Sequence, residues 1–140
     1  MADSLTLRVI TPERVVLDTS ATSVKFPGLD GSMGVLKGHA HMVSALDAGL
    51  LEWTVDGRVA GDMFVAGGFA EVRDNTVRIV TEAGEMADVI DVVRAEQAAL
   101  RAKERLKARK IEGADFDSRR AEAALRRAWL RRSVANRVKR

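Results

Sequence analysis

Cysteine is absent from this sequence of 140 residues, which excludes disulfide bonds and any zinc site or nucleophile built from a thiolate. Long apolar runs are absent too, since none approaches the roughly 20 residues that a membrane-spanning helix requires. The first residues, Met1-Ala2-Asp3-Ser4, lack the basic and apolar regions of a signal peptide. We therefore expect a soluble or peripheral protein with one main core, held together by packing alone.

Glycine and proline are nearly missing from the last third of the chain. Ten of the eleven glycines and both prolines lie before Glu85, where they separate short apolar stretches. After Gly84 the strong helix formers Ala, Arg, Glu and Lys predominate. This change predicts an α+β protein with two parts. We expect an N-terminal antiparallel β-sandwich, or flattened barrel, over residues 1–86 and a C-terminal antiparallel two-helix hairpin over residues 87–140.

The first part alternates apolar and polar residues, as strands with one buried face do. The pattern is clearest in residues 5–9, 24–26 and 49–55. Between the second and third of these, Pro27-Gly28-Leu29-Asp30-Gly31 predicts a turn, because proline presets φ and glycine tolerates positive φ. About eight to ten short strands fit the available length, and a two-sheet closure follows.

Two dipeptides predict tight hairpin turns. Asp56-Gly57 and Asp74-Asn75 lie between apolar stretches, and such residues adopt left-handed conformations readily. The second turn should join residues 69–72 to residues 77–80 as the last hairpin. Just before it, Ala66-Gly67-Gly68 predicts a bulge or a close approach of two backbones.

The second part predicts two helices joined by a short break. Asp88 is the expected N-cap of the first helix, with Asp91 in its first turn, and Arg109 and Lys110 suit its C-terminal end. The break falls at Glu112-Gly113-Ala114-Asp115, and Asp117 or Ser118 should cap the second helix. Arg126 lies four residues after Glu122, a spacing that predicts a supporting ion pair on the helix surface.

The apolar stripe of the first helix consists mostly of alanine. Val92, Ala95, Ala99, Ala102 and Leu106 follow one another at helical spacing on one face. Each buried methyl contributes only about 0.8 kcal/mol, against roughly 1.5–3 kcal/mol for a whole Leu or Val side chain. The seam between the helices is therefore close-packed but weak. Two interpretations stay open: a hairpin that separates as a conformational switch, and a small permanent hairpin.

Charge is divided unevenly along the chain. Residues 1–90 hold 7 Lys and Arg against 13 Asp and Glu (net −6), whereas residues 91–140 hold 16 against 7 (net +9). The helical part should therefore meet something acidic, which leaves nucleic acid, a membrane surface and an acidic protein segment as candidates. No nucleic-acid-binding motif accompanies the arginines, so sequence-specific recognition is disfavoured.

Few residues suggest catalysis. His39 and His41 are the only histidines, and a metal site would need a further ligand from a distant carboxylate, so we predict no metal and assign them to a loop. The sequence has no Ser-His-Asp spacing, phosphate-binding glycine loop or paired-carboxylate motif. We therefore expect a protein that is not an enzyme.

Four segments, in order and spacing, resemble the epsilon subunits of bacterial rotary F-type ATP synthases. They are Thr11-Pro12-Glu13-Arg14; Phe26-Pro27-Gly28 with Gly31, Gly34-Val35-Leu36 and Gly38-His39-Ala40; Gly67-Gly68-Phe69-Ala70-Glu71-Val72; and Ile90-Asp91-Val92-Val93-Arg94-Ala95. The resemblance covers nearly the whole chain. It implies a non-catalytic central-stalk subunit that binds the gamma subunit and the c-ring, couples c-ring rotation to the catalytic alpha and beta subunits, and lies on the cytoplasmic face of the bacterial inner membrane, touching the membrane only through the complex.

The resemblance also implies roles for particular residues. The turn containing Gly28, Leu29, Asp30, Ser32 and Met33 would face the c-ring, and His39 would lie toward gamma. A raised hairpin would bring basic residues of its second helix to an acidic segment of the catalytic subunits and so inhibit ATP hydrolysis. The candidates, chosen by charge, are Arg126, Arg127, Arg131 and Arg132.

Some relatives bind regulatory ATP through an Ile/Leu-Asp-x-x-Arg-Ala motif. Ile90, Asp91, Arg94 and Ala95 match it, and Glu85 and Arg101 fall at compatible spacings. The alternative is structural, with Asp91 and Arg94 forming only a first-turn cap and ion pair. No cofactor is required by the resemblance, but Mg-ATP is the candidate ligand. A free ATP-sensing module and a basic nucleic-acid-binding module remain the alternative functions.

Overall fold

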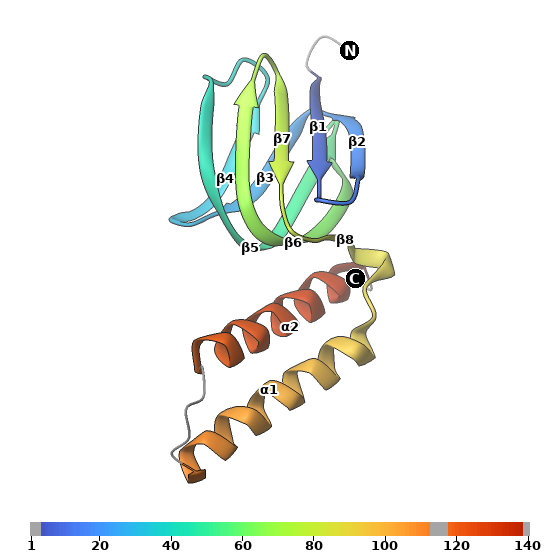
Figure 1. The fold of residues 1–140 in the computed structure, drawn as a ribbon. Coiled ribbons are helices and arrows are strands. Elements are labelled where there is room, and N and C mark those ends of the chain that lie inside the picture. The colour runs from blue at the N-terminus through green and yellow to red at the C-terminus, as the bar shows by residue number, and fades with distance from the viewer. Residues whose placement is uncertain (1–3, 113–117, 139–140) are drawn as a thin grey trace.

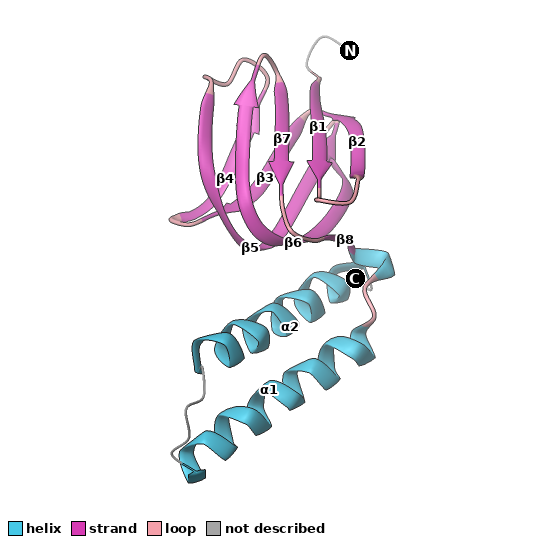
Figure 2. Cartoon of the chain, viewed as in Figure 1, coloured by secondary structure: helices cyan, strands magenta, loops and turns pink. Residues whose placement is uncertain are grey.

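The computed structural model describes residues 4–112 and 118–138, which form a strand-built domain and a helical hairpin (Figure 1). The elements, in order, are β1 (Leu5–Ile10), β2 (Val15–Ala21), β3 (Ser23–Gly28), β4 (Gly31–Leu36), β5 (Met42–Val55), β6 (Arg58–Arg73), β7 (Thr76–Val80), β8 (Gly84–Met86), the short 3₁₀ helix η1 (Ala87–Val89), α1 (Val92–Glu112) and α2 (Ser118–Val138). The predicted α+β class, with strands first and helices last, is confirmed (Figure 2).

The eight strands form one hydrogen-bonded sheet that folds over itself without closing. Its order is β2-β1-β7-β6-β5-β3-β4, with β8 paired to β6 off this path. All neighbouring strands are antiparallel except β1 and β7, which are parallel. The sequence pattern did not indicate this parallel pairing. The long strands β5 and β6 pair along nearly their whole lengths and reach both layers of the sandwich: β7 pairs with residues 69–73 at the end of β6, and β8 pairs with residues 63–65 near its middle.

The core lies between the two layers. It contains buried side chains from seven strands, because inward-facing positions alternate with exposed ones as the pattern predicted. The members with side chains of valine size or larger are Leu5, Leu7, Val9, Val24, Phe26, Val35, Leu46, Leu51, Trp53, Met63, Val65, Val72, Val77 and Ile79. The dipeptide turns are also confirmed, since Asp56, Asp74 and Asn75 have φ values of 50°, 48° and 58°.

The turn predicted over Pro27–Gly31 is shorter than expected. Only Leu29 and Asp30 form it; Pro27 pairs with Ser32, and Gly28 pairs with Gly31, inside the β3–β4 ladder. Proline is tolerated there because the other ladder of β3, toward β5, is interrupted between Lys25 and Gly28. A residue without an N–H therefore occupies a stretch where a regular ladder is already missing.

The start of the first helix also differs from the prediction. Asp88 lies in η1, and Asp91 is the N-cap of α1: its Oδ1 accepts a hydrogen bond from the Arg94 N–H at 3.0 Å. A carboxylate three residues before a free N–H satisfies a donor that the helix itself cannot satisfy. The predicted break at residues 112–115 and the alternative caps Asp117 and Ser118 fall wholly or partly outside the described residues.

The hairpin packs through the predicted alanine stripe. Ala95 and Ala102 on α1 and Ala121 and Ala128 on α2 are all buried. Figure 1 shows α2 lying between the sandwich and α1. A second apolar cluster joins α2 to the sandwich and consists of Phe64, Ala87, Ile90, Val134 and Ala135. Among the described residues, no helix is long and apolar enough to cross a membrane.

Candidate functional site

The face of α2 that meets the sandwich carries arginines paired with sandwich carboxylates. Arg126 forms a two-pronged pair with Asp47 on β5, its Nη1 and Nη2 donating to the two carboxylate oxygens at 2.7 and 2.8 Å. These hydrogen bonds lower the pKa of Asp47 and raise that of Arg126. The predicted supporting pair between Arg126 and Glu122 is replaced by this contact across 79 residues of sequence.

Removing the Asp47 charge should weaken the fold only at pH values at which the carboxylate is ionised. Because the pKa of Asp47 lies below 3.8 in the folded protein, the pair stabilises the fold above that pH, and its contribution is lost as the pH falls through the folded pKa. Both side chains are partly exposed, so Asp47→Asn is expected to cost about 0.2–1 kcal/mol at neutral pH and less near pH 3. Urea unfolding of both proteins at the two pH values tests this. An equal loss at both would contradict an ionic contribution.

A second contact lies at the end of α2. Arg137 reaches two carboxylates on neighbouring strands, with Nη2 against Glu52 of β5 and Nε 3.4 Å from Asp62 of β6. Glu52 and Asp62 face each other across the ladder, and their side chains are only 15% and 12% exposed. Burial is the main cause that raises the pKa of Asp62, while Arg137 acts to lower it.

A third contact involves Arg131. Its Nε lies 2.9 Å from Glu85 Oε1 of β8, an ion pair in which the N–H does not point at the oxygen. Its guanidinium also lies 5.0 Å from the centre of the Phe64 ring, within range of a cation–π interaction. Together, the three contacts hold α2 along the sandwich with opposite charges on the two sides.

The four arginines predicted to reach catalytic subunits are thus placed differently in this conformation. Arg126 and Arg131 bind the sandwich, Arg132 pairs with Glu96 of α1 at 3.4 Å, and Arg127 makes no ion pair with the described residues. Sequence reasoning missed Asp47, Glu52, Asp62 and Arg137. The opposite charges of the two halves were the available signal, since an acidic sandwich and a basic hairpin complement each other.

Five of the six candidate nucleotide-binding residues line one cavity of about 350 Å³. They are Glu85, Asp91, Arg94, Ala95 and Arg101, joined by Val89, Ala98 and Arg131. The sixth, Ile90, is buried in the cluster beneath α2 and does not line the cavity. The cavity brings together three arginines and two carboxylates, a set of charges suited to a polyphosphate and its counterion. Arg131 comes from α2, and the sequence spacing did not assign it to this site.

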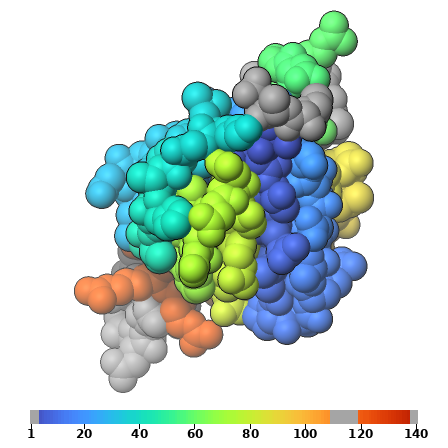
Figure 3. Space-filling view, turned by 90° about the horizontal axis from the view of Figure 1, so that it is seen from above, coloured from blue at the N-terminus to red at the C-terminus, as the bar shows by residue number. Residues whose placement is uncertain are grey.

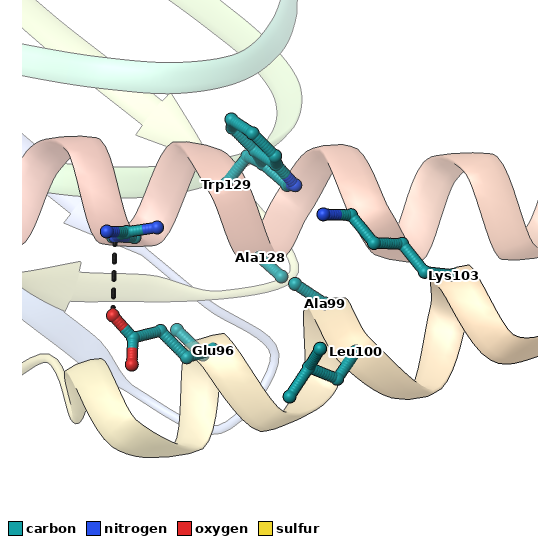
Figure 4. A pocket seen from close by; sticks show the side chains of 8 residues that line it. Glu96, Ala99, Leu100, Lys103, Ala128 and Trp129 are labelled. Atoms are coloured by element: carbon teal, nitrogen blue, oxygen red, sulfur yellow. Dashed lines mark ion pairs between the residues drawn. The ribbon is translucent and has the colours of Figure 1, made fainter.

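A smaller cavity of about 240 Å³ lies between the two helices. Its floor consists of alanines, including Ala99 and Ala128, and Leu100 and Trp129 form its walls (Figure 4). The Lys103 Nζ lies 5.2 Å from the centre of the Trp129 ring, and the Arg132–Glu96 pair closes one end. This cavity is mainly apolar, so it differs chemically from the charged one.

The residues predicted to meet the c-ring and gamma lie at opposite ends of β4. Leu29 and Asp30 form the exposed tip before this strand, with Gly28 buried beside it and Ser32 and Met33 following. His39 lies in the loop after the strand, and its Nδ1 hydrogen-bonds the Ala40 carbonyl at 2.8 Å. The six residues of β4, which span about 17 Å, separate the Leu29–Asp30 tip from the His39 loop.

The His39 loop is fastened to the neighbouring β6–β7 turn. The Gly38 N–H donates to Asn75 Oδ1 at 2.7 Å, and His41 Nε2 lies 3.1 Å from Asp74 Oδ1. Figure 3 looks onto this end, where the segment near residue 40 lies against that near residue 75. Through these hydrogen bonds His39 and His41 fix the loop. No group of three potential metal-binding side chains occurs in residues 4–112 and 118–138.

Comparison with known proteins agrees with this architecture along the whole chain. Residues 4–87 match the family model of the ATP synthase delta/epsilon chain β-sandwich domain, and residues 88–136 match that of its long α-helix domain. The ATP synthase epsilon chain of Symbiobacterium thermophilum is 49% identical over 96% of this chain and 94% of its own length. That of Desulfitobacterium hafniense strain Y51 is 41% identical over 96% of this chain and 98% of its own length.

Two solved structures share the fold. A chain in the Euglena gracilis mitochondrial ATP synthase OSCP/F1/c-ring assembly matches with a TM-score of 0.73 and 26% identity, covering 87% of this chain and 75% of its own. A chain of the Tetrahymena thermophila central stalk and c-ring gives 0.64 and 18%, covering 94% and 96%. Since both domains match in order and the bacterial relatives align over almost their entire lengths, this chain belongs to the ATP synthase epsilon subunit family.

Proposed function

We propose that this chain is a non-catalytic central-stalk subunit, peripheral on the cytoplasmic face of the bacterial inner membrane, whose sandwich joins gamma to the c-ring. The family and the Euglena assembly support membership of the rotary complex. The two candidate contact regions at opposite ends of β4 support a bridging role, because a rigid strand separates them. The Leu29–Asp30 tip faces the c-ring in this proposal, and the His39 loop faces gamma.

The hairpin is the regulatory part of the proposal. In the docked form, Arg126 and Arg131 are occupied by Asp47 and Glu85, so they cannot reach an acidic segment of the catalytic subunits at the same time. The Arg126 and Arg131 contacts are partly exposed ion pairs, each worth about 1 kcal/mol or less, and the apolar cluster beside them is small. Such a hairpin can leave the sandwich without unfolding it, and the released arginines then restrain ATP hydrolysis.

Two changes with opposite expected effects test this regulation in the assembled enzyme. Asp47→Asn combined with Glu85→Gln removes docking partners, so it should increase inhibition of ATP hydrolysis. Ending the chain after Ile90 removes the hairpin, so inhibition should disappear while gamma still copurifies. Asp18→Asn is the matched control, because it breaks the Arg8–Asp18 pair on β1–β2 instead. Hydrolysis rates that do not differ among these enzymes would refute an inhibitory hairpin.

The charged cavity is proposed to bind Mg-ATP as a regulatory ligand in the docked form. The observation that carries this is the meeting of Arg94 and Arg101 from α1 with Arg131 from α2 around one cavity that also contains Glu85. Because these groups come from β8, α1 and α2, a bound nucleotide would stabilise the docked hairpin by mass action. The motif alone allowed a purely structural cap, and Asp91 performs that task as well.

Calorimetry with Mg-ATP separates binding from helix capping. Arg94→Ala and Arg131→Ala should each weaken binding about tenfold or more, since each removes a charge-assisted contact. Arg132→Ala is the matched control: it is adjacent to Arg131 but lines the other cavity, and it should keep wild-type affinity. Binding that is unaffected by Arg94→Ala and Arg131→Ala, or absent in the wild type, would refute the site. Salt-dependent DNA binding in place of gamma binding would favour the nucleic-acid alternative.

A further inference from the structure

The contact of Arg137 with the sandwich contains one cation and two carboxylates. Glu52 and Asp62 are directly opposed on β5 and β6, and α2 covers both, leaving the side chains 15% and 12% exposed. A single guanidinium balances one of these charges. The docked site therefore holds a net negative charge in a place from which most water is excluded, and such a charge is costly to bury.

The geometry distinguishes the two carboxylates. Arg137 Nη2 makes its close contact with Glu52, whereas its Nε is 3.4 Å from Asp62 Oδ2. Asp62 Oδ1 is buried, and no described residue gives it a hydrogen bond. Asp62 is thus the less compensated of the two, and a neutral carboxylic acid suits its surroundings better than a carboxylate does.

The elements packed around this pair carry further charged groups. Lys25 on β3 is paired in register with Glu52 but is exposed, and Asp88 on η1 is exposed as well. On α2 the facing group is Arg137, and Lys139 and Arg140 lie outside the described residues. Burial and the neighbouring Glu52 raise the pKa of Asp62 even though Arg137 opposes the shift.

We propose that docking of the hairpin is coupled to uptake of one proton by the Glu52–Asp62 pair, with Asp62 as the protonated member. In the docked form, Arg137 and this proton together neutralise both carboxylates. When α2 leaves, water reaches the pair and the proton is released. Docking therefore strengthens as the pH falls through the docked pKa of Asp62, which is opposite in sign to the Asp47–Arg126 contact.

The proposal rests on the movable hairpin proposed above, and one experiment separates the two. Because the chain has no native cysteine, exposed Val43 and Leu100 can be replaced by cysteine and labelled with pH-insensitive dyes for energy transfer on the full chain. As the pH falls from about 8 to about 5, the docking equilibrium constant should rise, and a single proton limits the rise to about tenfold per pH unit.

The variants follow from the charge count. Asp62→Asn and Glu52→Gln each leave one carboxylate for one guanidinium, so both should flatten the pH dependence, and Asp62→Asn should be more docked than the wild type at pH 8. Asp47→Asn is the control and should keep the dependence while docking more weakly. If the hairpin undocks in about 1 M salt but its docking does not depend on pH, the proton linkage is overturned while the movable hairpin stands. A hairpin that stays docked in every condition would overturn both proposals.

Discussion

Phe64→Ala is expected to lower the free energy of unfolding by about 3–5 kcal/mol and to loosen the hairpin. Phe64 is fully buried, and it lies on the outer face of β6, where it packs with Ile90, Val134 and Ala135. Truncation leaves a cavity at the apolar contact between sandwich and helices. It also removes the ring that Arg131 covers at 5.0 Å, an interaction worth about 0.5–2 kcal/mol.

Phe69→Ala provides the matched control for this substitution. Phe69 lies on the same strand but is 44% exposed, so its truncation should cost about 1 kcal/mol or less. Urea unfolding followed by far-ultraviolet circular dichroism reports mainly the helices of the hairpin, and the fluorescence of the buried Trp53, measured in a Trp129→Phe background, reports the sandwich. Equal losses in the two variants would show that Phe64 does not anchor the hairpin. Loss of the helical signal at lower urea than the strand signal would show that the hairpin separates first.

The fold class was predictable because local patterns and long-range packing agree in most of this chain. Alternation located β1 and the last hairpin, and the alanine stripe of α1 is buried where helical spacing placed it. The parallel pairing of β1 with β7 was not predictable in this way, because it joins residues some 70 positions apart and no turn motif specifies it. Pro27 was misplaced because a missing ladder on one side of β3 is a tertiary feature.

The sequence motif named most residues of the candidate site, but it did not name the residue that joins them from α2. Asp91, Arg94 and Ala95 of the motif line one cavity, to which the structure adds Arg131, whose position depends on how α2 packs. One signal was overlooked. Met63, Phe64 and Val65 are consecutive and all buried, which breaks strand alternation and indicates a strand covered on both faces. Together with the opposite charges of the halves, it predicts that the hairpin docks on β6.

Gly68→Ala is expected to destabilise the protein by about 3 kcal/mol or more, although it adds a single methyl group. Gly68 has a φ of 116°, and an added Cβ would lie 1.9 Å from the Val80 carbonyl oxygen on β7, which is fixed backbone. The predicted close approach of two backbones is therefore present. The alternative prediction, a bulge at these glycines, is not: the β5–β6 register is regular at Gly68, and its irregularity falls between Trp53 and Thr54.

The position of Gly68 makes its substitution more than a local clash. Gly67 and Gly68 line a hollow beside Arg126, so a shift of β6 here would also move the surface on which α2 docks. Gly34→Ala is the matched control, since nothing lies within 4 Å of its added Cβ and its φ is not positive; thermal unfolding should show almost no change for it. If Gly68→Ala unfolded at the same temperature as the wild type, the close packing of β6 against β7 would not determine the shape of the surface on which α2 docks.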